Sequence, residues 1–217
     1  MFQNPNLSFT ETYRCYPVTF MSGNERENVN YGGKIILPPT ALAKLAGLNI
    51  EYPMLFELRN TNKQRHSHAG VLEFIAEEGR VYLPYWMMQT LLLSEGDLIE
   101  IKNTTLPLGT FVKIQPQSPD FLDISDPKAV LENSFRNFST LTQGDVIQIY
   151  YNNKTYEIMV LEVRSLESPN NPSIGISIVE TDLEVDFAPP VGYVEPKPQP
   201  KQSMVSLIRK LDLYLVI

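Results

Sequence analysis

The sequence predicts a β-rich α+β protein whose first half folds as a double-psi β-barrel. Two stretches, 34–58 and 80–101, look like copies of one unit. Each begins with a basic residue and a short strand that ends in Leu-Pro, and each continues with a short helix and a second strand. Paired strand-helix-strand halves of this size build the interlocked double-psi barrel. Proteases, decarboxylases and binding modules all use this scaffold, so the fold alone does not give the function.

The elements of the first half follow from apolar periodicity and from proline and glycine positions. Expected strands cover 13–21, 34–37, 54–58, 71–75, 80–83, 98–101 and 111–114, the last of which would close the barrel. A helix is expected over 41–46, opened by Pro39 or Thr40 and ended by Gly47, and a second around Met88 and Leu91. The polar stretch 60–67 is expected to be a turn.

The second half is predicted to be a smaller α+β unit after a stiff connection at 115–119, which holds two prolines. Asp126 before Pro127 is an N-cap pattern, and Leu131, Phe135 and Phe138 recur at helical spacing. Asn152-Asn153 lies between two alternating runs, which predicts a hairpin with a two-residue turn. Its register places Ile147, Ile149, Tyr156, Ile158 and Val160 on one face and Gln148, Tyr150, Thr155 and Glu157 on the other. The last expected strand covers 174–179.

Composition excludes several classes of partner. The 217 residues carry a formal net charge of −7, so no broad basic face is expected for nucleic acid or anionic membrane. The apolar stretch near the C-terminus is interrupted by Arg209, Lys210 and Asp212, and membrane insertion is not expected. No secretory signal is visible, and the single cysteine, Cys15, is interpreted as a buried or half-buried thiol. We expect a protein of the cytoplasm and nucleus.

No assembled catalytic or metal site is visible. His66 and His68 would share a face if extended, but a zinc site needs at least three ligands, and a solvated turn is the better interpretation. The paired acids Glu77-Glu78 and Asp123/Asp126 are explained as turn and helix-cap residues. No Asp-Thr-Gly, Asp-Ser-Gly or Gly-Ser string occurs. We therefore predict no enzyme activity, no cofactor and no metal.

Long strings of the chain closely resemble the ubiquitin-fusion-degradation family. They include EFIAEEGRVYLP (73–84), DFLDISDPKAVLENSFRNFSTLT (120–142) and ETDLEVDFAPPVGYVEP (180–196), and the resemblance covers roughly residues 13–196. It implies a double-psi β-barrel followed by a small α/β roll, similar to the N domain of the AAA ATPase that the family serves. On this basis we expect a barrel over 13–115, a roll over 120–196, and a linker with an apolar C-terminal segment over 197–217.

The resemblance also implies a non-enzymatic adaptor in ubiquitin-dependent degradation. Together with an Npl four-type partner subunit, the family recruits polyubiquitinated substrates to the hexameric AAA ATPase called Cdc forty-eight or valosin-containing protein. This region of the family binds ubiquitin and polyubiquitin chains, whereas the tail beyond it binds the partner and the ATPase. The given sequence contains no Phe-x-Gly-x-Gly-type segment of the kind with which the family docks on the ATPase.

Two candidate interaction sites follow from the residues. Tyr150, on the polar face of the hairpin, is the candidate contact for the apolar patch of ubiquitin. In the C-terminal segment, apolar residues at helical spacing form either a partner-docking amphipathic helix or the apolar end of an altered chain. These residues are Met204, Leu207, Ile208, Leu211 and Leu215.

Two other functions stay open beside the adaptor. One is a hydrolase on the double-psi scaffold, which would require raised carboxylate pKa values in a shared cleft. The other is a purely structural subunit of the complex, whose surface would carry no patch that responds to ubiquitin.

Overall fold

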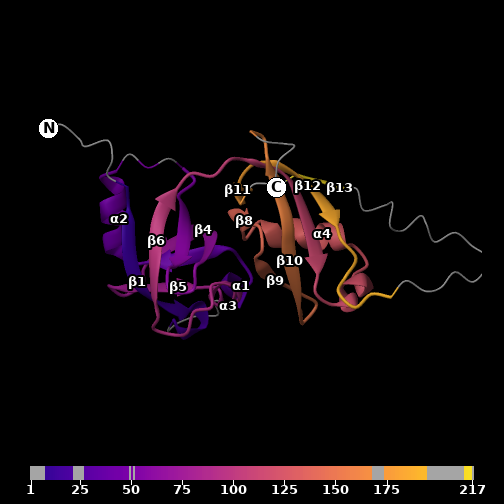
Figure 1. The fold of residues 1–217 in the computed structure, drawn as a ribbon, viewed down its shortest axis with the longest axis horizontal. Coiled ribbons are helices and arrows are strands. Elements are labelled where there is room, and N and C mark those ends of the chain that lie inside the picture. Colours follow the sequence, from indigo (N-terminus) through magenta and orange to yellow (C-terminus); the bar gives the residue numbers. More distant parts are fainter. Residues whose placement is uncertain are drawn as a thin grey trace, which may run out of the picture.

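The computed structural model describes residues 8–21, 27–48, 50, 52–167 and 174–194, together with the backbone of 213–216. Two units lie side by side in Figure 1, a barrel made of β1–β6 and a second unit made of β7–β13. The elements of the barrel unit are β1 (Thr10–Pro17), η1 (Val18–Phe20), α1 (Glu27–Asn30), β2 (Lys34–Leu37), α2 (Pro39–Ala46), β3 (Leu55–Asn60), β4 (Arg65–Phe74), β5 (Arg80–Leu83), α3 (Tyr85–Thr90) and β6 (Leu98–Thr104). Those of the second unit are β7 (Gly109–Pro116), η2 (Pro119–Asp123), α4 (Pro127–Phe135), β8 (Thr140–Thr142), β9 (Val146–Tyr151), β10 (Lys154–Ser165), β11 (Gly175–Ser177), β12 (Asp182–Phe187) and β13 (Leu213–Val216).

The barrel is closed and mixed, with the strand order β1-β5-β2-β4-β3-β6. β1 is parallel to β5 and β2 is parallel to β4, whereas β1 and β3 each pair antiparallel with β6. The two sequence repeats therefore contribute equivalent strands, β2 and β5, which are neighbours in the barrel. In both repeats a Leu-Pro pair ends the strand and the next residues begin a helix.

Three of the elements predicted for the first half differ from the structure. The expected strand over 13–21 ends at Pro17, and Val18–Phe20 forms η1 instead. The expected closing strand at 111–114 lies in β7, which pairs with β10 and β12 of the second unit. The barrel is already closed by the pairing of β1 with β6, so no open edge remains for another strand. The expected turn over 60–67 is also too long, because β4 begins at Arg65 and pairs along its length with β3.

The second unit contains a five-stranded sheet in the order β13-β12-β7-β10-β9 and a small sheet of β8 and β11. The predicted helix is α4, and the carboxylate of Asp126 accepts the backbone N–H of Ala129 as its N-cap. It ends at Phe135, so Phe138 is buried but lies beyond the helix and not on its predicted face. The predicted hairpin is β9–β10, and Asn152 and Asn153 both have positive φ. Its predicted inner residues are all buried, so the register is confirmed. The strand β12 was not predicted, and the expected strand at 174–179 is shortened to β11.

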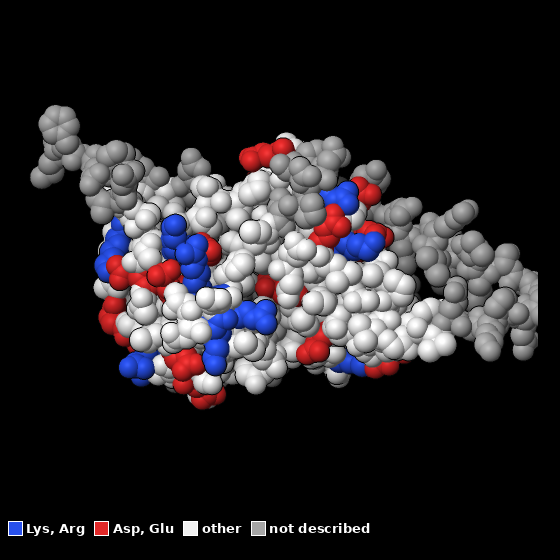
Figure 2. All heavy atoms as spheres, in the orientation of Figure 1, with Lys and Arg blue, Asp and Glu red and all other residues white. Residues whose placement is uncertain are grey.

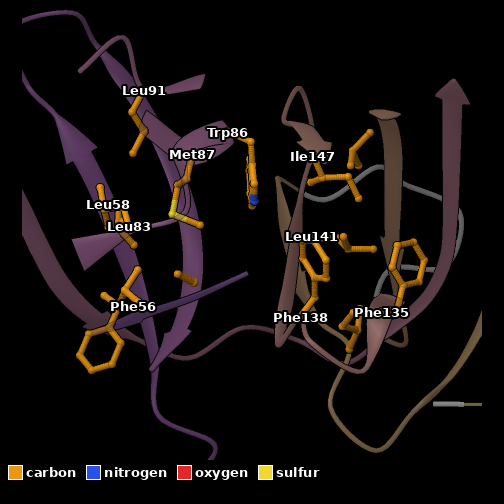
Figure 3. Packing of buried hydrophobic residues seen from close by; sticks show 14 of the residues in the cluster. Phe56, Leu58, Leu83, Trp86, Met87, Leu91, Phe135, Phe138, Leu141 and Ile147 are labelled. Atoms are coloured by element: carbon orange, nitrogen blue, oxygen red, sulfur yellow. The ribbon is translucent and has the colours of Figure 1, made fainter. Parts of the chain in front are cut away.

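A continuous apolar core joins the two units. Figure 3 shows Trp86 of α3 at the boundary, with barrel residues on one side and residues of the second unit on the other. The indole N–H of Trp86 donates to the carbonyl of Gly32 at 2.9 Å, and its ring lies 6.0 Å from that of Phe138. Because the boundary is packed as a core, the two units hold their shared surfaces in a fixed geometry.

Candidate functional site

Two tyrosines from distant parts of the sequence stack at the outer edge of the boundary between the units. The rings of Tyr31 and Tyr150 have centroids 4.9 Å apart and an interplanar angle of 19°. Tyr150 is 45% exposed, so one aromatic surface remains available to solvent. Its hydroxyl lies 3.3 Å from Oδ1 of Asn153, and the hydroxyl of Thr155 lies 3.4 Å from that of Tyr31. We call Tyr31 and Tyr150 the tyrosine pair.

Local sequence positions both members of the tyrosine pair. Tyr150 stands on the outer face of β9 because the Asn152-Asn153 turn fixes the hairpin register. Tyr31 is followed by Gly32 and Gly33, where the backbone N–H of Gly33 donates to the carbonyl of Asn137. A Cβ at Gly32 would lie 2.8 Å from that same carbonyl oxygen, so glycine permits the close approach that brings Tyr31 over the hairpin.

Polar side chains extend from the tyrosine pair along the hairpin. Gln148 donates to Glu157 across the strands at 3.1 Å, and Lys154 forms an ion pair with Asp120. Beside them is a shallow hollow of about 410 Å³. Its lining residues are Gln117, Ser118, Asp120, Phe121, Gln148, Lys154, Thr155, Tyr156 and Glu157. An exposed aromatic group with a polar rim is the arrangement expected of a protein-binding surface.

The structure places Tyr150 where the sequence predicted, on the exposed face of the hairpin. Sequence reasoning missed its partner, Tyr31. The two residues are far apart in the chain, and no periodicity or spacing connects them. Only the packing of the barrel against the second unit brings them together.

A buried polar seam lies deeper in the same boundary. The hydroxyl of Ser67 donates to the carboxylate of Asp145 at 2.6 Å, and the hydroxyl of Thr140 donates to the carbonyl of His68 at 2.8 Å. The ring Nδ1 of His68 lies 3.0 Å from the hydroxyl of Thr142. All five side chains are buried, so their mutual contacts replace hydrogen bonds to water. This seam holds β4 of the barrel against β8 and the turn that follows it.

Burial shifts the pKa of two groups in the seam in opposite directions. Burial raises the pKa of the Asp145 carboxyl to about 7, and the hydrogen bond from Ser67 opposes this only in part. Burial lowers the pKa of His68 to about 4, although the nearby Glu57 carboxylate opposes that shift. His68 is 8% exposed, so the prediction that it lies in a solvated turn is wrong. The β3–β4 pairing extends past the expected turn, and the second unit covers the strand.

A second hollow, a groove of about 710 Å³, runs between the β3–β4 hairpin and the second unit. Its lining residues are Glu57, Arg59, Asn60, Thr61, Gln64, Arg65, His66, His68, Leu106, Pro107, Ile174 and Gly175. Arg59 contacts Glu57 with two hydrogen bonds, of 2.7 and 2.9 Å. In this bidentate ion pair, the two charged side chains of β3 neutralise each other.

Three of the four carboxylates considered as catalytic candidates have separate structural partners. Glu77 accepts a hydrogen bond from Tyr82, Glu78 accepts one from Thr40, and Asp126 caps α4. No three His, Cys, Asp or Glu residues come together as a possible metal site within the part of the chain that the structure describes. Cys15 is fully buried, as predicted. None of the helices among the described residues is long and apolar enough to cross a membrane.

Charged residues of both signs are interspersed on the face drawn in Figure 2. Blue and red groups alternate over the barrel half, and much of the surface over the second unit is uncharged. This face therefore offers no extended basic area to a polyanion.

The predicted C-terminal helix is wrong at Leu215, which lies in the strand β13. The open edge of β12 offers backbone donors and acceptors that an extended segment satisfies, and 213–216 pairs with it. The other candidates of this segment, Met204, Leu207, Ile208 and Leu211, lie outside the described residues.

Both units match family models. Residues 9–107 match "Ubiquitin fusion degradation protein UFD1, N-terminal subdomain 1", and residues 108–190 match subdomain 2 of the same protein. The boundary between the two matches falls between β6 and β7, where the barrel ends and the second unit begins.

Curated relatives are similar over nearly the whole chain. The ubiquitin fusion degradation protein 1 of Saccharomyces cerevisiae is 60% identical over 196 residues, which are 90% of this chain and 53% of the relative. That of Schizosaccharomyces pombe is 55% identical over 203 residues, 94% of this chain and 58% of the relative. The human "Ubiquitin recognition factor in ER-associated degradation protein 1" is 54% identical over 200 residues, 92% of this chain and 62% of the relative. The chain thus spans little more than half the length of these relatives.

Proposed function

The chain belongs to the family of the ubiquitin fusion degradation protein UFD1, and from this we propose that it recognises ubiquitin in ubiquitin-dependent protein degradation. The names of its relatives, a ubiquitin fusion degradation protein and a ubiquitin recognition factor in ER-associated degradation, support this proposal. The second name describes recognition, and the acids Glu77, Glu78 and Asp126 are bound in separate structural contacts. The proposed action is therefore binding without catalysis.

The observation that carries a binding surface on this chain is the tyrosine pair. Tyr150 is exposed, rigidly stacked on Tyr31 and surrounded by polar side chains of the hairpin. A rigid aromatic group loses little conformational entropy on binding, so it suits the small apolar patch that ubiquitin offers. We assign the ubiquitin contact to this surface, with Tyr150 at its centre.

The test is an NMR titration of the labelled chain with mono-ubiquitin and then with polyubiquitin chains of the degradation-signalling linkage. Shifts should gather at the amides around Tyr31, Tyr150 and Thr155. Tyr150→Ala should weaken binding about tenfold or more, because truncating an aromatic hot spot at the centre of an interface costs about 2 kcal/mol or more, and each 1.4 kcal/mol is a factor of about ten in affinity. Tyr151→Ala is the matched control, since Tyr151 is the next residue on the same strand and is similarly exposed. Equal effects of the two substitutions would remove the tyrosine pair from the proposal.

Polyubiquitin should bind more tightly than mono-ubiquitin. Linked ubiquitins raise the effective concentration for a second contact once the first has formed. Equal affinity per chain for mono-ubiquitin and tetra-ubiquitin would show that a single ubiquitin accounts for all of the binding.

The remaining features of the family are proposals for this chain as well. We propose that its barrel has double-psi topology, that the second unit is a small α/β roll, and that the pair resembles the N domain of the AAA ATPase. The proposed partners are an Npl four-type subunit and the hexameric Cdc forty-eight or valosin-containing protein ATPase, and the proposed location is the cytoplasm and nucleus. Pull-down of the ATPase with the chain, with and without the partner subunit, tests the assembly directly.

A further inference from the structure

The outer edge of β12 is a site for strand pairing in the second unit, and residues 213–216 occupy it. The barrel is closed, and α3 packs against β9 at the opposite end of the five-stranded sheet. One edge of β12 pairs in parallel with β7, and the other edge pairs with residues 213–216 as β13. Figure 1 shows β12 and β13 side by side at the end of the sheet. An open edge of this kind is a template for any extended segment that can pair with it.

The side chains of β12 define what such a segment must carry. Leu183 and Val185 are fully buried in the core, whereas Glu184 and Asp186 alternate with them on the other face. The carboxylate of Asp186 is paired with Lys113 at 3.0 Å, and no ion pair holds Glu184 among the described residues. A pairing segment therefore meets two aliphatic positions on one face and a carboxylate on the other.

The register of β13 matches this requirement. Leu213 stands opposite Val185 and Leu215 stands opposite Leu183, while Tyr214 stands opposite Glu184. Residues directly opposite in an antiparallel pair share a face of the sheet. The Leu-Tyr-Leu-Val sequence also combines aliphatic and aromatic residues that favour strands.

We propose that the β12 edge is a strand-binding site for extended segments with an aliphatic-x-aliphatic pattern, and that residues 213–216 of this chain are its resident occupant. The C-terminal strand is detachable, and its own sequence supplied as a separate peptide competes for the edge. This is binding by strand addition, in which main-chain hydrogen bonds give affinity and alternate side chains give specificity. The site is independent of the tyrosine pair, which lies on the hairpin of β9 and β10.

The first test is a disulfide between register partners in the full chain, Glu184→Cys with Tyr214→Cys. Directly opposite residues bring their Cβ atoms within about 4.5–5.5 Å, close to disulfide geometry. Cys15 does not compete, because it is fully buried and burial raises the pKa of its thiol to about 11. We expect a monomeric disulfide to form at least tenfold faster than in the control Glu184→Cys with Gln202→Cys. Equal rates would overturn the proposal, and predominant disulfide-linked dimers would assign the edge to a second copy instead.

The second test asks whether the edge accepts a strand in trans. The probe is an acetylated peptide of residues 209–217, added to the labelled full chain with Tyr214→Pro, in which proline cannot donate to the ladder. We expect this variant to bind the peptide at least tenfold more tightly than the parent chain, with NMR shifts at amides of 182–187. A peptide with proline at the position of Tyr214 is the control. Failure of the variant to bind the probe, or equal binding by parent and variant, would overturn the proposal.

The third test uses charge at one register position. Because Tyr214 stands opposite Glu184, a lysine there forms an opposite-charge pair and a glutamate forms a like-charge pair. Peptides with Tyr214→Lys should therefore bind the Tyr214→Pro chain more tightly than peptides with Tyr214→Glu, by about threefold or more. The same order should disappear in a chain that also carries Glu184→Gln. An order that survives Glu184→Gln would contradict the assigned register.

Discussion

The hydroxyl of Ser67 donates a 2.6 Å hydrogen bond to the carboxylate of Asp145, and this contact joins the barrel to the second unit. Both residues are buried, so the bond lies within the boundary that also positions the tyrosine pair. A buried carboxylate with a single side-chain hydrogen bond is costly in its charged form. The stability of the boundary therefore depends on whether Asp145 is protonated.

Asp145→Asn should remove a pH dependence of stability. Burial raises the pKa of Asp145 from 3.8 to about 7, so the folded chain retains a proton that the unfolded chain releases. The stabilisation from this group is therefore complete below about pH 4 and is lost as pH rises through 7. A shift of that size corresponds to roughly 4 kcal/mol. In urea unfolding from pH 4 to 8, the free energy of unfolding of the variant should rise relative to that of the parent as the pH rises.

The control for this prediction is Asp123→Asn, the same change at an exposed acid of the second unit. It should leave the pH dependence of the parent in place. If Asp145→Asn and the parent differ by a constant free energy at every pH, the raised pKa of Asp145 is contradicted.

His68→Gln should make the pH dependence of stability that Asp145 causes easier to see, because it removes the opposite pH dependence that His68 causes. Burial lowers the pKa of His68 from 6.5 to about 4, so the unfolded chain binds a proton that the folded chain does not. The contribution of His68 thus makes stability rise with pH from about 4 to 6.5, against the trend from Asp145. Without it, the free energy of unfolding should fall steeply as pH rises from 4 to 7. A profile in His68→Gln that rises between pH 4 and 6.5 as it does in the parent would contradict this account.

Gly70→Ala should destabilise the boundary, and a second substitution should rescue it. A Cβ at Gly70 would lie 2.3 Å from the hydroxyl oxygen of Ser139 and 2.7 Å from its Cβ. Such overlap costs roughly 1–3 kcal/mol of the free energy of unfolding. Ser139→Gly removes both atoms and should recover a large part of that loss in the double variant. Gly47→Ala is the control, because its nearest neighbour would be 3.5 Å away.

Elements with strong local signals could be predicted from the sequence. The Asn152-Asn153 turn and the Asp126-Pro127 cap each carry their own chemistry, and the structure has both where they were expected. The two Leu-Pro repeats also carry a local signal, because proline ends each strand, and the strand-helix pairs were predicted correctly from it. In each case the deciding interactions lie within a few residues along the chain.

Features that depend on distant contacts could not be predicted in this way. The strand at 111–114 is as apolar as a barrel strand. It lies outside the barrel because β1 pairs with β6 and closes it. The polar residues around His68 predict a solvated turn, but the second unit covers the His68 side chain. Tyr150 could be found from hairpin register, whereas Tyr31 required the packing of both units.

Asp126→Ala should weaken α4 by about 1 kcal/mol, the typical cost of losing an N-cap. The Asp126 carboxylate accepts the N–H of Ala129 at 3.1 Å, and α4 carries the buried Leu131 and Phe135. Thermal unfolding should show a lower midpoint, and Asp126→Asn should retain much of the stability because its amide oxygen also accepts the bond. Asp123→Ala, at an acid that caps no α-helix here, should change the midpoint much less. Equal losses from Asp126→Ala and Asp123→Ala would contradict the capping account.

Tyr31→Ala should weaken ubiquitin binding through Tyr150, if the tyrosine pair is the contact surface that we propose. Tyr31 stacks on Tyr150 with centroids 4.9 Å apart and holds its ring in one orientation. Stacked aromatic pairs are worth about 0.5–1.5 kcal/mol beyond their burial. A double-mutant cycle of Tyr31→Ala and Tyr150→Ala on polyubiquitin affinity should therefore be non-additive by about that amount. The cycle of Tyr31→Ala with Tyr151→Ala should be additive, and additivity in both cycles would show that Tyr31 does not act through Tyr150.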